Sequence, residues 1–156
     1  MILVVMGLWF GTRYLFMAYV RFSLSDDMLD IRKYYLERDD YSFWVAESGG
    51  ELVGTVAALP SSEPGGEKHL ELKRLSVSKS HRGKGIAKAL CRMVIDFARE
   101  RDCEAVVLTT TLAQISAWKM YEKMGFRRVQ SFIPPNFLYK LFSFKVLAYQ
   151  YDLPSH

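Results

Sequence analysis

Residues 75–90 read LSVSKSHRGKGIAKAL, and this stretch decides the fold because a basic, glycine-containing turn joins a strand pattern to a helix pattern. The segment before the turn alternates in strand fashion, and the segment after it repeats apolar residues at helical spacing. The first N–H groups of a helix lack intrahelical partners, and the helix dipole is positive there. Gly83 and Gly85 would let a ligand approach the backbone closely. The stretch therefore predicts a cradle for a phosphate group.

Basic side chains continue along the predicted helix. Lys84, Lys88 and Arg92 follow one another at intervals of four, so they share one face, and like charges at this spacing repel by a few tenths of a kcal/mol per pair. Residues 68–101 hold ten Lys and Arg against three Asp and Glu, a local net charge of +7. A bound polyanion would offset this charge, and a solvated basic face is the alternative. The P-loop and dinucleotide-binding glycine patterns are absent, and the basic field is too narrow to favour nucleic acid.

The composition suits one globular domain of ordinary size. Of the 156 residues, 50% are hydrophobic and 24% are charged, which is enough to build a packed core. Cys91 and Cys103 lack CxxC spacing, which favours buried thiols in a reducing compartment. The three histidines are scattered, so the sequence predicts no metal site.

Strand and helix patterns alternate through most of the chain. Ser48-Gly49-Gly50 joins strand-like runs at 42–47 and 51–60, which is typical of a hairpin. Further strands are expected at 69–78, 105–110, 126–132 and 145–153, with helices at 26–37, 83–102 and 113–125 and a loop at 61–68. This order indicates the α/β class, an α+β mixed sheet.

Residues 1–22, MILVVMGLWFGTRYLFMAYVRF, form a hydrophobic helix pattern long enough to span a bilayer, interrupted by Arg13. We expect a membrane segment over 1–22, followed by a globular domain over 23–156. Half of a membrane hairpin, an interfacial helix and a signal anchor remain open, as does a core helix of a soluble domain. A cleaved signal peptide fits poorly, because no small-residue cleavage site follows.

Two motifs resemble the GNAT acetyltransferase superfamily. Arg82-Gly83-Lys84-Gly85-Ile86-Ala87 matches its [Q/R]-x-x-G-x-[G/A] motif, and Ala117, Tyr121 and Gly125-Phe126 match its second motif in the expected order. The likeness covers about residues 40–153. It implies the acyl-CoA N-acyltransferase fold and acetyl-CoA as cosubstrate.

More narrowly, the sequence is similar to the camello-like, membrane-anchored N-acetyltransferases, on the evidence of FWVAE, the stretch around HRGKGIAKAL and the hydrophobic first segment. This resemblance implies a location in the membrane, in the endoplasmic reticulum or Golgi. Members of that branch carry a longer N-terminal part before the membrane segment, whereas this chain starts within the hydrophobic segment.

The resemblance also implies a set of cofactor-binding residues. The diphosphate of acetyl-CoA would lie on the backbone of residues 82–87, and the pantetheine arm would pair with the strand near Leu75, Ser76 and Val77. Lys84 and Lys88 would reach the phosphates as point charges. Gln114 stands where many members have an asparagine that contacts the cofactor arm. The full predicted set is Leu75, Ser76, Val77, Arg82, Gly83, Lys84, Gly85, Ile86, Ala87, Lys88 and Gln114.

Two residues are predicted to be catalytic. Tyr121 is implied as the acid that protonates the leaving thiolate. Glu71 is the candidate base for the attacking amine, and a strict period of two would place it on one strand face with Lys73, Leu75 and Val77. The expected reaction is N-acetylation of an amine, either a small amino-acid conjugate or a protein lysine, by direct attack. The alternatives are a weakly active or inactive CoA-binding membrane protein and, in third place, a nuclear enzyme that acetylates histone tails.

Overall fold

The computed structural model describes residues 2–135, 140 and 144–154. It divides into two compact units, Met1–Asp39 and Asp40–His156. The boundary predicted after residue 22 concerns the end of a membrane segment and stays a prediction.

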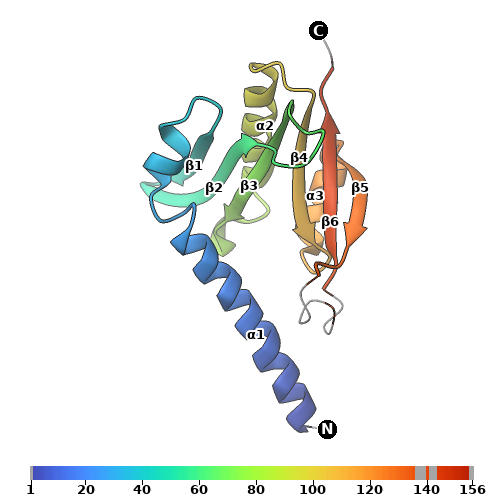
Figure 1. Cartoon of the computed structure of the whole chain (residues 1–156). Coiled ribbons are helices and arrows are strands. Elements are labelled where there is room, and N and C mark those ends of the chain that lie inside the picture. The colour runs from blue at the N-terminus through green and yellow to red at the C-terminus, as the bar shows by residue number, and fades with distance from the viewer. Residues whose placement is uncertain (1, 136–139, 141–143, 155–156) are drawn as a thin grey trace. The chain divides into compact units, whose positions relative to one another are not determined.

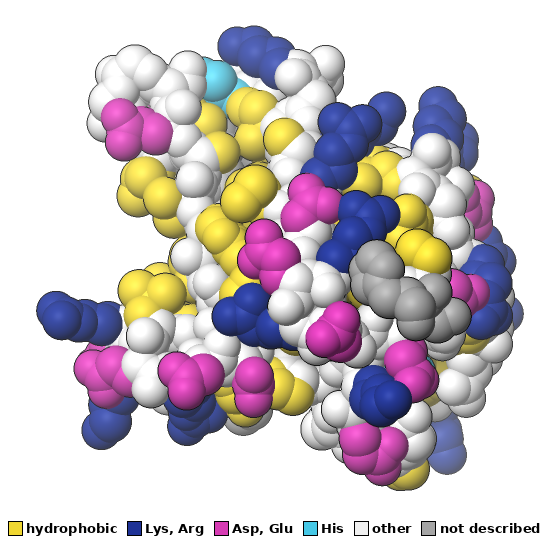
Figure 2. Space-filling model, turned by 90° about the horizontal axis from the view of Figure 1, so that it is seen from above, with side chains coloured by type: hydrophobic (Ala, Val, Ile, Leu, Met, Phe, Trp, Pro, Cys, Tyr) yellow, Lys and Arg dark blue, Asp and Glu magenta, His cyan; other side chains and the backbone are white. Residues whose placement is uncertain are grey.

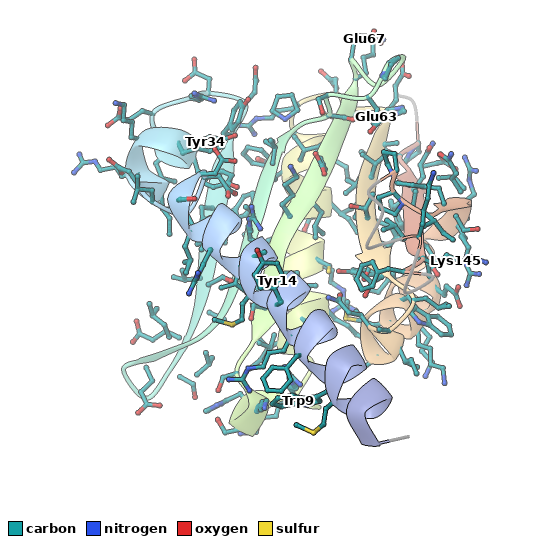
Figure 3. All side chains as sticks on the ribbon, turned by 60° about the horizontal axis from the view of Figure 1, so that its bottom comes forward. Trp9, Tyr14, Tyr34, Glu63, Glu67 and Lys145 are labelled. Atoms are coloured by element: carbon teal, nitrogen blue, oxygen red, sulfur yellow. The ribbon has the colours of Figure 1, made fainter. Side chains whose placement is uncertain are left out.

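The first unit begins with the long helix α1, Ile2–Ser25, which confirms helix over the hydrophobic segment. Trp9 and Tyr14 project from it with more than half of their side chains exposed (Figure 3). Among the described residues, no helix combines the length and the apolarity that crossing a membrane requires.

The helix predicted over 26–37 is wrong in extent, since only the π-helical turn η1, Arg32–Leu36, forms there. Asp30 lies just before this turn, and its carboxylate accepts a hydrogen bond from the Lys33 N–H at 3.0 Å, a local contact that competes with helical structure through residues 26–30. Tyr35 is fully buried, and its hydroxyl donates to the buried Asp27 carboxylate. This hydrogen bond satisfies two polar groups in the interior of the turn.

The second unit is built on one mixed sheet of six strands in the order β1-β2-β3-β4-β6-β5 (Figure 1). The strands are β1 Ser42–Ser48, β2 Glu51–Pro60, β3 His69–Val77, β4 Ala105–Thr111, β5 Arg127–Phe132 and β6 Val146–Asp152. The β3–β4 pair is parallel and the other four pairs are antiparallel. Each predicted strand therefore forms within one or two residues of its expected bounds.

Two helices cover one face of this sheet. Helix α2, Ile86–Arg99, and helix α3, Ile115–Met124, place their apolar side chains in a single core with the strands. Leu90 and Val94 of α2 and Leu70 and Val106 of the sheet are at most 5% exposed, and burying each such side chain contributes about 1.5–3 kcal/mol. The 3₁₀ turn η2, Lys79–His81, links β3 to α2.

The loop at 61–68 connects β2 to β3 and carries the acidic residues Glu63 and Glu67 (Figure 3). Lys68 at its end pairs with Glu104 at 2.9 Å, but both side chains are largely exposed, so this ion pair contributes little. The face in Figure 2 likewise shows Lys and Arg interspersed with Asp and Glu.

A β-bulge in β3 overturns one sequence-based expectation. Leu70 and Leu72 face α2, as do Leu75 and Val77, because Arg74 is an extra residue that breaks the alternation. Glu71 therefore does not share a face with Leu75 and Val77. It lies with Lys73 and Ser76 on the opposite face, since their cross-strand partners on β2 are the residues that point away from α2.

Candidate functional site

The parallel strands β3 and β4 pair only at their beginnings. Their register runs from His69↔Ala105 to Glu71↔Val107 and then stops. Beyond these pairs β3 is bonded to β2 and β4 to β6, so the two strands diverge toward their carboxyl ends (Figure 1). We call the region between 72–77 and 108–111 the β3–β4 gap. Its two edges offer unpaired backbone donors and acceptors to an extended ligand.

The bulge shapes one edge of this gap. Thr55 pairs with Ser76 and Ala57 pairs with Lys73, so two residues of β3 lie opposite one of β2. Arg74 takes a left-handed conformation, with φ 55°. The Thr55 hydroxyl donates to the Arg74 carbonyl at 2.9 Å and holds it. A bulge disrupts the ladder locally and leaves the backbone of the extra residue out of the regular strand pairing. Sequence reasoning missed both Thr55 and the bulge.

An unpaired row of backbone N–H groups lies at the start of α2. The N–H groups of residues 83–88 donate to no acceptor within the described part of the chain, and the first helical bond runs from Ala89 N to Gly85 O at 3.0 Å. We call residues 83–88 the amide nest. Gly83 and Gly85 have φ of 79° and 83°, and a methyl group added to either would meet no protein atom within 4 Å. Arg82, the first residue of the predicted range 82–87, lies outside the nest because its N–H donates to the Lys79 carbonyl at 3.5 Å. The nest is open and lies at the positive end of a helix dipole, and the binding of a phosphate there stays a prediction.

The basic side chains around the nest differ in whether they are already hydrogen-bonded within the protein. Arg82 donates from Nε to the Val77 carbonyl at 3.2 Å, which fastens the turn to the end of β3. Lys84 and Lys88 are exposed and make no ion pair or hydrogen bond with another described residue. His81 contacts Ser80 and belongs to the turn. The two lysines are therefore free to meet an anion at the nest.

Gln114 caps the start of α3 at the far edge of the gap. Thr110, buried on β4, donates its hydroxyl to the Gln114 side-chain carbonyl at 2.9 Å. This contact uses the acceptor of the amide and leaves its NH₂ group without a partner among the described residues. Gln114 is thereby oriented as a hydrogen-bond donor.

Tyr121 lies on α3 and is only 5% exposed. Its ring packs against Phe126 and Tyr149, with centroids 5.6 and 6.2 Å away. Burial, and to a lesser degree the neighbouring Cys91 thiol, raises the pKa of Tyr121, so the phenol keeps its proton. Its hydroxyl has no hydrogen-bond partner among the described residues, yet no described side-chain oxygen is both unpaired and fully enclosed. The hydroxyl is thus a proton donor that a small group can reach.

Glu71 lies at the point where the β3–β4 gap begins. Burial raises the pKa of this carboxyl, and Lys73, whose Nζ lies 3.5 Å from Glu71 Oε2, opposes the shift. A carboxylate with a raised pKa is a stronger base than an exposed one. Tyr121 and Glu71 sit on opposite faces of the sheet, Tyr121 on the helix face. One face of the sheet therefore carries a candidate base and the other a candidate acid.

Comparison with known proteins places these features in a family. A family model described as "Acetyltransferase (GNAT) family" matches residues 9–126. The chain is 45% identical over 149 residues to N-acetyltransferase 8B of Rattus norvegicus and 47% identical over 150 residues to N-acetyltransferase 8 of the same species. Each match covers 95% of this chain and 67% of the relative.

A solved structure supports the fold. A putative streptothricin acetyltransferase from Bacillus anthracis, crystallised in complex with acetyl coenzyme A, superposes with a TM-score of 0.69 at 18% identity. The match covers 78% of this chain and 67% of the other.

Proposed function

Because the chain belongs to the acetyltransferase (GNAT) family, we propose that it transfers the acetyl group of acetyl-CoA directly to an amine. The observation that carries this proposal is the amide nest at the end of the β3–β4 gap. Six consecutive N–H groups at a helix start suit a diphosphate, and the two open strand edges suit the amide-bearing arm behind it.

The cosubstrate would follow these features in order. Its diphosphate lies on residues 83–88, with Lys84 and Lys88 as flanking charges. Its pantetheine arm runs along the backbone of 75–77 and receives a hydrogen bond from the Gln114 amide. The Bacillus anthracis structure, which shares the fold, was crystallised in complex with acetyl coenzyme A.

The reaction needs two proton transfers. The amine nitrogen attacks the thioester carbonyl carbon, a new C–N bond forms and the C–S bond breaks. Glu71 takes the proton that the amine loses, and a backbone N–H at the bulge stabilises the oxyanion. Tyr121 gives a proton to the departing thiolate, which leaves CoA as a neutral thiol.

The pKa of Tyr121 does not argue against this role. Burial raises the pKa of the adjacent Cys91 thiol to about 12. A CoA thiolate that departed beside Tyr121 would also lose hydration, which would make it a stronger base toward the phenol.

The acceptor class stays open between S-substituted cysteines, aspartate and protein lysines. The segment 132–144, FIPPNFLYKLFSF, is rich in aromatic residues and would suit a hydrophobic acceptor site or contact with a bilayer, and part of it lies outside the described residues.

An assay of the full chain with acetyl-CoA tests the proposal. Each acceptor class is supplied in turn, CoA release is followed with a thiol reagent, and the product is identified by mass spectrometry. We expect release that depends on one class of amine. Binding of acetyl-CoA without turnover on any amine would favour the alternative of an inactive CoA-binding protein. If acetyl-CoA causes no thermal shift and no CoA is released, the proposal is wrong.

We also propose that α1 associates with a membrane, in the endoplasmic reticulum or Golgi. The support is its set of exposed aromatic side chains, Trp9, Phe10 and Tyr14. Arg13 lies 5.3 Å from the centre of the Trp9 ring, so its charge has a cation–π partner. Fractionation of cells expressing the full chain should place it in membranes until detergent is added. Recovery in a detergent-free nuclear extract would instead favour the histone-tail alternative.

A further inference from the structure

Helix α3 carries the candidate acid but is held against the sheet by a thin apolar face. All ten of its residues, Ile115–Met124, are described, and Tyr121 alone among them is buried. Helix α2, in contrast, buries five of its fourteen residues. A helix of ten residues is only marginally stable by itself, so its position depends on contacts with the rest of the fold. The direction in which Tyr121 points therefore depends on the contacts that fix α3 against the sheet.

A closed hydrogen-bonded network fastens α3 to the strands β5 and β6. The hydroxyl of Tyr149 on β6 donates to Glu122 Oε1 on α3 at 2.8 Å. Arg128 on β5 donates from Nη2 to the same oxygen at 3.1 Å and from Nε to the Tyr149 hydroxyl oxygen at 3.3 Å. The guanidinium of Arg128 also lies 5.8 Å from the centre of the Trp118 ring of α3, which is a cation–π contact. We call Glu122, Arg128 and Tyr149 the α3 anchor.

The α3 anchor is coupled to Tyr121 in two ways. Glu122 follows Tyr121 directly in the chain, so the hydrogen bonds that Glu122 accepts set the rotation of α3 about its own axis. The Tyr149 ring also packs against the Tyr121 ring, with centroids 6.2 Å apart. A side-chain atom about 5–6 Å from the axis moves by about 1 Å when a helix rotates by about 10°. Misplacing a reacting group by about 1 Å can cost about 100-fold in rate.

A second ion pair on β5 provides a comparison. Arg127, the neighbour of Arg128, donates to the Asp152 carboxylate from Nε at 2.9 Å and from Nη2 at 3.3 Å. This pair joins β5 to β6 and involves no residue of α3. Its side chains are 59% and 55% exposed, and those of Arg128 and Glu122 are 43% and 41% exposed. Both pairs are screened by solvent, so neither should contribute much to the stability of the fold.

We propose that the α3 anchor positions the Tyr121 hydroxyl for proton transfer to the departing thiolate, with Glu122 as the positioning residue. This inference rests on the proposed function, in which the C–S bond breaks and the proton moves from the Tyr121 oxygen to the sulfur of CoA. The phenolate that remains regains a proton from solvent. Glu122 acts through Tyr121 and does not touch the reacting atoms. Its loss should slow the chemical step and spare acetyl-CoA binding, because the amide nest belongs to α2 and the turn before it.

The test measures kcat, the KM for acetyl-CoA and the dissociation constant of acetyl-CoA in variants of the full chain. S-methylcysteine, aspartate and a lysine-containing peptide are tried as acceptors, and the one with the fastest CoA release by the wild-type chain is used throughout. Glu122→Ala removes the shared acceptor, and Tyr149→Phe removes the hydroxyl but keeps the ring. We expect each to lower kcat at least about tenfold and to leave both acetyl-CoA constants within about twofold of wild type.

Two further variants sharpen the measurement. Glu122→Gln keeps a side-chain oxygen that can accept from Tyr149, so it should keep kcat within about threefold of wild type. Asp152→Ala is the matched control, because it removes the carboxylate partner of the neighbouring arginine and leaves the α3 anchor intact. It should keep the wild-type kcat. A loss of kcat in Glu122→Gln as large as in Glu122→Ala overturns the assignment, as does a wild-type kcat in Glu122→Ala.

A double-mutant cycle with Tyr121→Phe distinguishes positioning from a general structural effect. If Glu122 acts through the Tyr121 hydroxyl, Glu122→Ala should lower kcat by less than about twofold where that hydroxyl is already absent. A loss by the same factor in both backgrounds shows that the effect does not pass through Tyr121, and the assignment is then wrong. Should Glu122→Ala fail to fold, the same cycle with Tyr149→Phe gives the answer.

The outcomes also separate this inference from the proposed function. If the wild-type chain releases no CoA with any of the three acceptors, the proposed function is wrong and the positioning role with it. An unchanged rate in Tyr121→Phe overturns the acid role and the positioning role but leaves acetyl transfer intact. A loss of rate in Tyr121→Phe without one in Glu122→Ala overturns the positioning role alone.

Discussion

Replacement of Gly85 by alanine should separate the cost of the backbone conformation from the cost to cosubstrate binding. Gly85 has φ 83°, and an added methyl group meets no protein atom within 4 Å. The cost to the free protein is thus the left-handed conformation alone, about 1–2 kcal/mol. For a domain of this size this should lower the melting temperature by about 2–8 °C.

The matched control is Gly65→Ala in the loop between β2 and β3. Gly65 has φ 78° and equally open surroundings, but it lies far along the chain from the amide nest. Its replacement should cost the same stability. Only the methyl group at Gly85 would lie within the nest itself, where we expect it to hinder the approach of a diphosphate.

The dissociation constant of acetyl-CoA in each variant then shows whether the diphosphate lies on the nest. Losing one charge-assisted hydrogen bond, about 1.5–3 kcal/mol, should raise the dissociation constant of acetyl-CoA by about tenfold to about 150-fold in Gly85→Ala and leave it unchanged in Gly65→Ala. Calorimetry gives the constants and thermal unfolding gives the stabilities. If Gly85→Ala lowers the melting temperature as Gly65→Ala does but keeps the wild-type affinity, the diphosphate does not lie on the nest and the reasoning fails.

Three further changes test the chemistry. Tyr121→Phe should slow CoA release by at least about tenfold without changing acetyl-CoA affinity, and an unchanged rate would exclude the acid role. Glu71→Gln should abolish the acidic limb of the pH–rate profile, which the raised pKa of Glu71 moves above the range of an exposed carboxyl. Because a raised folded-state pKa means that ionised Glu71 costs stability, Glu71→Gln should also stabilise the protein at neutral pH, and this difference should vanish as the pH falls below the ordinary pKa of a glutamate. Thr55→Val removes the hydroxyl that holds the Arg74 carbonyl and should lower kcat more than it raises KM for acetyl-CoA, whereas Thr55→Ser should retain the rate. An equal loss of kcat in Thr55→Val and Thr55→Ser would show that the Thr55 hydroxyl does not contribute to the rate.

Local features could be predicted from the sequence because their causes are local. The nest depends on glycines beside the first turn of α2, and its unpaired N–H groups follow from the i→i−4 pattern of a helix. Gly83 and Gly85 therefore indicated it without any knowledge of the rest of the fold. The strand bounds followed in the same way from alternation and from turns such as 48–50.

Features that depend on a contact between residues distant in the sequence were decided only by the tertiary structure. The bulge at Arg74 exists because β3 must match β2 on one side while diverging from β4 on the other, and a period of two in β3 contains no trace of it. It moved Glu71 to the face opposite Leu75. Arg92 of α2 and Lys123 of α3 likewise line one pocket only because the two helices lie side by side, since these residues are 31 positions apart in the chain. The sequence determined which charges and glycines are present, and packing decided which of them meet, because contacts between elements are set by the sheet order and not by spacing along the chain.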